Sequence, residues 1–221
     1  MRLDAPNALD LIYLQYMMAF VLFHTQIKRI LLLGLGGGAL AKFCHHHLPD
    51  ADLVAVESHP DVIAFRDFFH IPCDSARFSV QLSDAALHIE QPAPGVDIIL
   101  MDAFDGQGVA PSVSQIAFYR QAKNRLNAKG ILVANISGES EARQNHLELN
   151  RSAIGDNLLL ASVDQGSNHI VIAFRDPQFE PRWKWINQQA LAMKARFGID
   201  LPKIAADFRR NQVRGWESVP L

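Results

Sequence analysis

The sequence predicts an α/β fold in which a mostly parallel sheet of about seven strands ends in an antiparallel hairpin and carries helices on both faces. Short runs rich in Val, Ile and Leu recur along the first three quarters of the chain, and segments of helical length separate the first five of them. This alternation indicates a parallel sheet covered by helices. The last two runs are joined by a turn too short for a crossover, so they must pair antiparallel.

The strands are expected at apolar runs that turn residues bound on either side. The first five are short, and we expect them to be buried on both faces. The predicted strands, in chain order, are 29–34, 52–57, 77–82, 96–102, 130–137, 157–164 and 169–176.

The helices are expected between these strands, at 38–48, 60–69 and 112–128, and the last of them is expected to end at Gly130 as a C-cap glycine. After the hairpin the chain is predicted to form amphipathic helices. Their expected packing residues are Trp183, Trp185, Leu191 and Phe197.

The apolar stretch 8–23 is the one candidate for a membrane or targeting segment. It contains Asp10 and Gln15 and is shorter than the roughly 20 apolar residues that a membrane span requires. It also lacks a basic beginning and a small-residue cleavage site, so it does not resemble a signal peptide. We therefore predict a buried helix and no membrane partner.

Length and composition favour one soluble domain, since 221 residues with 49% hydrophobic and 20% charged residues can bury a sizeable core. We expect an N-terminal helical segment at 1–28, a core at 29–176 and C-terminal helices at 177–221. A formal charge of -2 without a Lys/Arg cluster argues against a nucleic-acid partner and favours small molecules.

Cysteine and histidine usage predicts neither disulfides nor a metal. Cys44 and Cys73 are too few for a disulfide framework, which favours a reducing cytoplasm. The three adjacent histidines in CHHHLP, residues 44–49, would point about 100° apart on a helix and cannot converge on one ion.

A glycine-rich turn suggests a nucleotide site. In LLLGLGGGAL, Gly34, Gly36 and Ala39 match G-x-G-x-x-G/A between a predicted strand and a predicted helix. Such a turn lets backbone N–H groups approach a ligand, although a tight turn that needs positive φ would also select glycine. Glu57 ends the next strand 21 residues after Gly36, near the spacing at which an acid binds the ribose hydroxyls; capping of the following helix is the alternative role.

Two further acids follow strands of the same sheet. Asp84 follows the third strand and Asp102 ends the fourth. Ligands of an open parallel sheet lie outside the carboxyl ends of the strands, so Gly36, Glu57, Asp84 and Asp102 should face one crevice. Each acid by itself could instead be a helix N-cap.

Five segments together resemble one family. LLLGLGGGAL, AVESHPDVIAFRDFF, RFSVQLSDA, VDIILMDAFDGQGVAP and AFYRQAKNRLNAKGILVANI are similar to the spermidine synthase family, the polyamine aminopropyltransferases. The resemblance runs from about residue 8 to residue 175. It implies the Rossmann-like class I fold that binds S-adenosylmethionine.

The resemblance implies a role for each matching residue. Gly34 and Gly36 would line the sulfonium or thioether end of the donor, and Glu57 would bind the ribose. The adenine would lie beside Asp84 and Ala85.

It also implies how the acceptor is handled. Asp102 and Asp105 fall on the two aspartates of the family's D-S-x-D-P loop, of which the first is the proposed base. Tyr13 falls, with a one-residue gap, where the family has a tyrosine that contacts the polyamine.

The chain departs from the family pattern at several positions. Gly37 replaces the aspartate thought to hold the aminopropyl ammonium, and the 102–106 loop has Ala103 for Ser/Thr and Gly106 for Pro. Gln15 stands where an acid is usual. About thirty residues precede the glycine turn, so we expect the family's N-terminal β-domain to be almost absent.

The chemistry expected of such a crevice is aminopropyl transfer from decarboxylated S-adenosylmethionine to a polyamine such as putrescine, with methylthioadenosine as product and no metal. The amine arrives protonated, so a carboxylate must bind it and accept its proton. Asp102 and Asp105 could divide these duties, and their mutual repulsion would raise the pKa of one of them; a turn role for Asp105 is the alternative.

Two other classes stay open from the sequence. One is a methyltransferase that uses intact S-adenosylmethionine, for which Gly37 would leave room for the methionine carboxylate, and the other is a catalytically silent nucleotide-binding homologue. A dehydrogenase is disfavoured because the hairpin replaces the second mononucleotide-binding half. The resemblance also allows a homodimer.

Overall fold

The computed structural model describes residues 5–105, 108–138, 140–163 and 168–214. Its centre is a seven-stranded sheet of order β3-β2-β1-β4-β7-β9-β8. The strands are β1 (Arg29–Leu33), β2 (Asp52–Glu57), β3 (Phe78–Leu82), β4 (Val96–Met101), β7 (Leu126–Ser137), β8 (Leu158–Val163) and β9 (Asn168–Phe174). Every neighbouring pair is parallel except the two that involve β9, so the predicted parallel sheet with one antiparallel hairpin is confirmed.

Two short helices precede β1, others lie between successive strands, and two close the C-terminal end of the described chain. They are α1 (Ile12–Met17), η1 (Met18–Leu22), α2 (Ala39–His47), α3 (Pro60–Ala64), α4 (Ala85–Glu90), η2 (Pro111–Val113), α5 (Ile116–Arg125), α6 (Ser140–Ile154), α7 (Trp183–Phe197) and α8 (Leu201–Arg214). A short antiparallel pair, β5 (Phe104–Asp105) and β6 (Gly108–Val109), follows β4.

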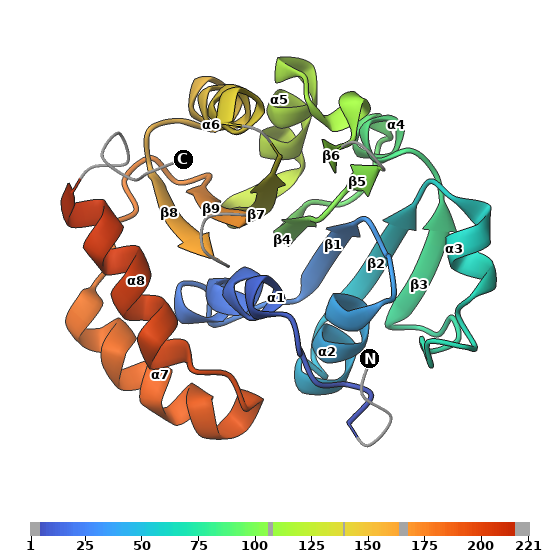
Figure 1. Cartoon of the computed structure of the whole chain (residues 1–221), viewed down its shortest axis with the longest axis horizontal. Helices are drawn as coiled ribbons and strands as arrows, with labels where there is room; N and C mark the ends of the chain where they lie inside the picture. The colour runs from blue at the N-terminus through green and yellow to red at the C-terminus, as the bar shows by residue number, and fades with distance from the viewer. Residues whose placement is uncertain (1–4, 106–107, 139, 164–167, 215–221) are drawn as a thin grey trace.

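Helices cover both faces of the sheet, as the strand pattern predicts (Figure 1). One core cluster joins the sheet to α1, η1, α2, α7 and α8, through side chains such as Phe20, Phe43 and Phe208. A second joins the opposite face to α4, α5 and α6, through Tyr119 and Leu147. The neighbouring strands β1 and β4 are followed by α2 and α5, which pack on opposite faces of the sheet, so a crevice opens at the carboxyl ends of these two strands.

The expected burial of the strands holds at the centre of the sheet and fails at its edge. All six residues of β4 are buried, whereas β3 is an edge strand that exposes Gln81 and Leu82. The residues of β3 do not reveal that this strand lies at the edge of the sheet, where it pairs with β2 alone.

The apolar N-terminal stretch forms two short helices, and only its second half is buried as predicted, because Leu11 and Ile12 are exposed. Met17 to Leu22 are all buried against the sheet. In the part of the chain that the structure describes, no helix is long and apolar enough to cross a membrane.

The helix predicted at 112–128 ends at Arg125, and Gly130 is not a helix cap. Leu126 has an extended backbone and pairs with Val96, so β7 begins there. Between this pair and the next regular pair the strand is irregular. A Cβ on Gly130 would come within 2.9 Å of both the Asn127 carbonyl oxygen and the Leu126 Cβ. A residue without a side chain is therefore needed where β7 is irregular.

The helix predicted at 60–69 is also shorter, because α3 ends at Ala64. Beyond it the amides of Phe65 and Arg66 donate to carbonyls only three residues back, and His70, with φ of 53°, reverses the chain. The reversal brings the apolar Ile71 into the core, where it is 4% exposed. Tertiary packing of Ile71 therefore outweighs continuation of the helix.

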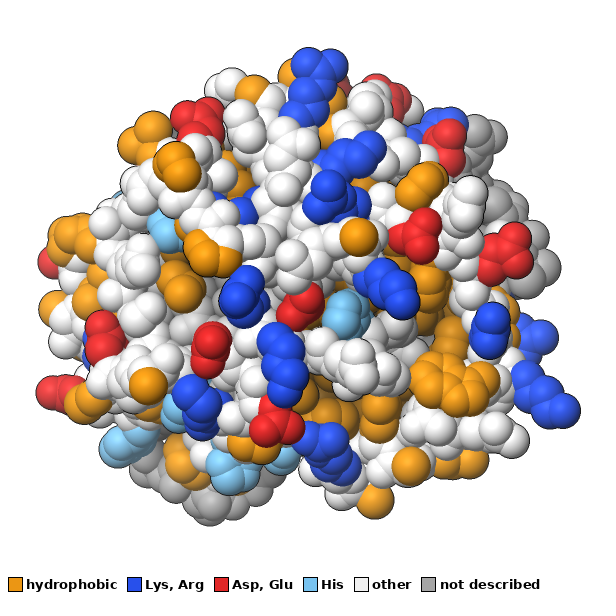
Figure 2. All heavy atoms as spheres, turned by 180° about the vertical axis from the view of Figure 1, so that it is seen from behind, with side chains coloured by type: hydrophobic (Ala, Val, Ile, Leu, Met, Phe, Trp, Pro, Cys, Tyr) orange, Lys and Arg blue, Asp and Glu red, His pale blue; other side chains and the backbone are white. Residues whose placement is uncertain are grey.

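Two of the four expected packing residues of the C-terminal helices pack inward. Phe197 is buried and Trp183 is partly buried against the core, but Trp185 and Leu191 are exposed. The inner side of α7 is formed instead by Ile186 and Ala190. On the face seen in Figure 2, basic and acidic side chains are interspersed.

Candidate active site at the carboxyl edge of the sheet

Two adjoining pockets lie at the carboxyl ends of the central strands. The large pocket has a volume of about 380 Å³ and the small pocket about 200 Å³. Both are lined by Tyr13, Gly34, Gly36 and Asp102. Asp102 therefore stands where a molecule in one pocket would meet a molecule in the other.

The glycine turn has two different reasons for its missing side chains. Gly34 has φ of 95°, and a Cβ there would lie 2.2 Å from the Asp102 carbonyl oxygen. The backbone of β4, not a ligand, thus excludes a side chain at this position. Gly36 has φ of 50° and no atom within 4 Å of its built Cβ, so it leaves open space in both pockets.

Glu57 holds the glycine turn and faces the large pocket at the same time. It is 7% exposed. Its Oε2 accepts hydrogen bonds from the amides of Leu35 at 3.0 Å and Gly36 at 3.4 Å, and its Oε1 accepts one from the amide of His59 at 2.9 Å. The structural role of Glu57 is therefore to hold the glycine turn and not to cap α3, whose N-cap is His59 without a side-chain cap hydrogen bond, and Glu57 still lines the large pocket.

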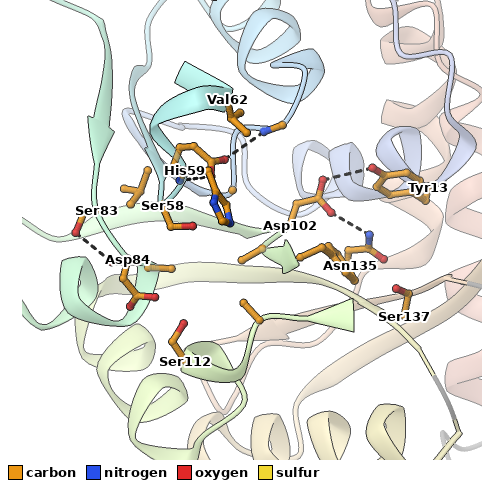
Figure 3. A pocket seen from close by; sticks show the side chains of 18 of the residues that line it. Tyr13, Ser58, His59, Val62, Ser83, Asp84, Asp102, Ser112, Asn135 and Ser137 are labelled. Atoms are coloured by element: carbon orange, nitrogen blue, oxygen red, sulfur yellow. Dashed lines mark hydrogen bonds between the residues drawn. The ribbon is translucent and has the colours of Figure 1, made fainter. Parts of the chain in front are cut away.

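Asp84 both caps a helix and lines the large pocket, which the sequence had offered as alternatives. It is the N-cap of α4, where its Oδ1 accepts hydrogen bonds from the amides of Ala86 at 2.8 Å and Leu87 at 3.1 Å. Asp84 and Ala85 both line the large pocket. Figure 3 shows Asp84 and Ser112 at the end of this pocket away from Tyr13.

Asp102 is oriented by hydrogen bonds to both of its carboxylate oxygens. Asn135 Nδ2 donates to Oδ1 at 2.9 Å, and the Tyr13 hydroxyl donates to Oδ2 over a longer 3.5 Å. In Figure 3 the two side chains point toward Asp102. Burial raises the pKa of Asp102, and these two hydrogen bonds partly oppose the rise because they stabilise the carboxylate.

Asp105 is the one predicted catalytic residue whose side chain lies outside the described part of the chain. Its backbone belongs to β5 and pairs with Gly108. Among the described residues, no group of three His, Cys, Asp or Glu is placed to hold a metal ion. Cys44 is buried and Cys73 is exposed, and both are free thiols.

Asn135, at the carboxyl end of β7, is a pocket residue that the sequence pattern did not single out. It is 2% exposed and lines the large pocket, and its Oδ1 has no hydrogen-bond partner among the described residues. The sequence does contain a hint, because Asn135 is the one side-chain amide in the apolar run ILVANIS. Further polar pocket residues that the sequence did not single out are Ser58, His59, Ser112, Ser137 and Asn168.

The strand order, the final antiparallel strand and the glycine turn after β1 define a Rossmann-like fold of the class I methyltransferase type. Human methyltransferase-like protein 13, solved with SAH, shares this fold at a TM-score of 0.73, with 20% identity over 84% of this chain and 92% of that one. A spermidine synthase solved with the transition-state analogue AdoDATO shares it at a TM-score of 0.67, with 15% identity over 86% of this chain and 76% of that one.

Sequence comparison identifies the family within this fold. The spermine/spermidine synthase domain matches residues 10–152. A polyamine aminopropyltransferase of Chromobacterium violaceum is 32% identical over 201 residues, which are 90% of this chain and 77% of the relative. The chain belongs to the spermine/spermidine synthase family.

Proposed function

We propose that this chain is a spermidine synthase-like transferase that moves an aminopropyl group from decarboxylated S-adenosylmethionine to a polyamine such as putrescine. The observation that carries the proposal is the Asp102 carboxylate, which stands where two pockets meet and is held by Asn135 and Tyr13. The name of the Chromobacterium relative and the AdoDATO in the spermidine synthase neighbour support the same reaction.

The nucleoside of the donor belongs in the large pocket. Glu57 would accept hydrogen bonds from the ribose hydroxyls, since its oxygens already face both the glycine turn and this pocket. Asp84 uses Oδ1 to cap α4, so we assign Oδ2 to the adenine amino group, beside Ala85. Gly34 and Gly36 then border the sulfonium end near Asp102.

The acceptor amine belongs in the small pocket, which has a carboxylate at two points of an otherwise largely apolar wall. Asp10 and Asp102 line it together with leucine side chains and Phe69. Ammonium groups separated by methylenes match such a wall, because the charges meet carboxylates and the chain meets apolar surface. Lys42 also lines the pocket, and its Nζ donates to the Phe69 carbonyl oxygen at 2.7 Å.

Transfer requires the acceptor nitrogen to lose a proton and attack carbon. Asp102 accepts the proton, and its raised pKa suits it to this task. A bond forms between the nitrogen and the propyl carbon attached to sulfur, and the carbon–sulfur bond breaks. Its electron pair stays on sulfur, which leaves neutral methylthioadenosine. Asp105 is proposed as the second acid of the same loop.

The test is release of methylthioadenosine from decarboxylated S-adenosylmethionine and putrescine. Asp102→Asn keeps the shape but cannot accept the proton, so we expect the rate to fall by about 10² to 10⁴. Asp105→Asn is measured beside it, and Asp200→Asn, in an exposed ion pair with Lys194, is the control that should keep the parent rate. Undiminished transfer by Asp102→Asn would contradict the proposed base.

A second candidate, methyl transfer from intact S-adenosylmethionine, is favoured by Gly37. Gly37 lines the small pocket and brings no carboxylate to it. A Cβ at Gly37 would meet only the Phe69 ring, at 3.7 Å, so the space beside Gly37 is open to the methionine carboxylate of the intact donor. Formation of S-adenosylhomocysteine with intact donor, and no product with the decarboxylated one, would select this candidate. Binding of methylthioadenosine with neither product would indicate a silent nucleotide-binding homologue.

A further inference from the structure

A buried histidine lies behind the wall of the large pocket, outside the residues assigned to the reaction. His146 on α6 is 3% exposed, and Tyr119 on α5 is fully buried beside it. The Tyr119 hydroxyl lies 2.9 Å from His146 Nδ1, and Ser114 Oγ lies 3.2 Å from His146 Nε2. The imidazole thus bridges two hydroxyl groups from different elements.

The far end of this chain of contacts reaches the pocket wall. Ser114 Oγ lies 3.0 Å from the Ala110 carbonyl oxygen, and the Ala110 amide donates to the Ala103 carbonyl oxygen at 3.0 Å. Ala103 follows Asp102 directly, and Ala103 and Ala110 both line the large pocket. Contacts therefore run without a break from α5 and α6 to the residue next to the proposed base.

The Ala110 carbonyl group, where this series of hydrogen bonds ends, fixes which atoms donate and which accept. A carbonyl oxygen can only accept, so Ser114 must give its one hydroxyl hydrogen to Ala110. Ser114 Oγ then accepts from His146, which must carry its hydrogen on Nε2. Nδ1 is left as an acceptor, and the Tyr119 hydroxyl donates to it. This arrangement satisfies both ring nitrogens in a buried place.

We propose that His146, neutral and with its hydrogen on Nε2, is a positioning residue that fixes the 110–114 segment as one wall of the nucleoside pocket. Burial lowers the pKa of His146 and raises that of Tyr119, which agrees with a neutral imidazole and a protonated phenol. The inference deepens the proposed function, on which it rests only where nucleoside binding is concerned.

The tautomer is tested directly by two-bond ¹H–¹⁵N correlation of ¹⁵N-histidine-labelled protein at neutral pH. We expect the pattern of an imidazole with hydrogen on Nε2, and the pattern of an Nδ1–H imidazole would overturn the proposal. This measurement depends on neither nucleoside binding nor catalysis.

The positioning role is tested by hydrogen exchange of the Ala110 amide and by titration with methylthioadenosine. Ser114→Ala removes the hydrogen bonds of Oγ to Ala110 and His146, and Tyr119→Phe removes the one to His146. Both variants should speed exchange and weaken binding, by about three- to tenfold. Ser114→Thr keeps the hydroxyl and should restore both values. Ser162→Ala is the matched control, because it removes another serine–histidine hydrogen bond, 3.0 Å long, to His169.

The outcomes separate this inference from the proposed function. Unchanged Ala110 exchange in Ser114→Ala overturns the positioning role, even if Tyr119→Phe does not fold. Faster exchange with unchanged melting temperature supports it, whereas loss of stability alone, equal to that of Ser162→Ala, indicates a merely structural network and overturns it. A parent that binds no methylthioadenosine would contradict the proposed function, and the tautomer and the exchange rates would still decide the inference.

Discussion

At the scale of single residues, the candidate base is defined by two opposing influences on one carboxyl group. Burial raises the pKa of Asp102, while Asn135 and Tyr13 stabilise the carboxylate and lower it. The base must be ionised to accept a proton, so activity should fall as the pH drops through this raised pKa. The acid side of the pH–rate profile therefore reports the environment of Asp102.

Removing Asn135 should move that acid limb to higher pH. Asn135→Ala deletes the 2.9 Å hydrogen bond to Oδ1, so the carboxylate loses a stabilising donor and its pKa rises further. The measurement is kcat/KM for putrescine as a function of pH in the parent and the variant. An acid limb at unchanged pH would show that Asn135 does not act on the titrating group.

Glu57 and Asp84 explain why residue roles could be predicted only in part. The strand-end positions and the spacing from the glycine turn placed both acids on the pocket, as the structure shows. The spacing offered a structural role only as an alternative to the pocket, and it could not show that Glu57 holds the glycine turn or that Asp84 caps α4 while lining the pocket. Asn135 was missed because no spacing rule links it to Asp102, 33 residues away in the chain.

The two roles of Glu57 can be separated by two substitutions. Glu57→Gln keeps one carbonyl oxygen but loses the charge, so it should weaken methylthioadenosine binding while the turn persists. Glu57→Ala also removes the acceptors of the Leu35, Gly36 and His59 amides and should in addition lower the stability, by about 1 to 3 kcal/mol. Calorimetric titration and denaturant unfolding measure the two effects. Parent-like affinity in both variants would exclude Glu57 from the nucleoside site.

At the scale of elements, the sequence predicted the strands well and the helix ends poorly. Strand runs are dense in Val, Ile and Leu because the central strands are buried on both faces. The ends of α3 and α5 depend instead on tertiary contacts, namely the burial of Ile71 and the pairing of Leu126 with Val96. No local pattern around these residues encodes the partner that ends the helix.

The C-terminal helix α8 is joined to α1 by a tyrosine that the sequence did not single out. The Tyr16 hydroxyl donates to Asp207 Oδ2 at 2.5 Å and accepts from Lys203 Nζ at 2.7 Å. These contacts lower the pKa of Asp207, although burial opposes them. Since α1 also carries Tyr13, this junction supports the wall of both pockets from outside.

Tyr16→Phe should lower the free energy of unfolding by about 1 to 2 kcal/mol at neutral pH, because it removes the partly buried hydrogen bonds to two charged groups, Asp207 and Lys203. Asp207 has a lowered pKa in the folded protein, so its contribution is present above its unfolded pKa and is lost as the pH falls through the folded pKa. The difference between parent and variant should therefore shrink in acid. Urea unfolding at neutral and acidic pH checks this.

The matched control for that junction is the exposed pair of Lys194 and Asp200, 3.0 Å apart. Asp200→Asn should change stability by less than about 1 kcal/mol, as exposed ion pairs do. If Tyr16→Phe costs no more than Asp200→Asn, the Tyr16 hydrogen bonds contribute little to the docking of α8.

At the scale of the whole molecule, the site follows from the strand order. The chain runs outward from β1 to β3 on one side and from β4 to β8 on the other, so the connections diverge and open the crevice in which both pockets lie. In the proposed function, nucleoside recognition belongs to Glu57 at the end of β2 and to Asp84 at the N-cap of α4, whereas the proposed base, Asp102, follows β4. Binding and chemistry are thus assigned to different strands and should be separable by substitution.

This separation predicts how methylthioadenosine stabilises the protein against heat. A ligand that binds only the folded state at 100 times its Kd adds about 2.7 kcal/mol of stability, and we expect the same shift of Tm in the parent and in Asp102→Asn. Glu57→Gln should show a smaller shift at the same ligand concentration. Without ligand, Asp102→Asn should unfold at no lower temperature than the parent at neutral pH. Folding raises the pKa of Asp102, so this carboxyl contributes stability below its unfolded pKa and loses that contribution as the pH rises through the folded pKa. At neutral pH the parent therefore carries a buried charge, which the neutral amide of Asp102→Asn avoids. If Asp102→Asn loses the ligand shift while Glu57→Gln keeps it, the nucleoside is held by β4 and the assignment of the two pockets must be reversed.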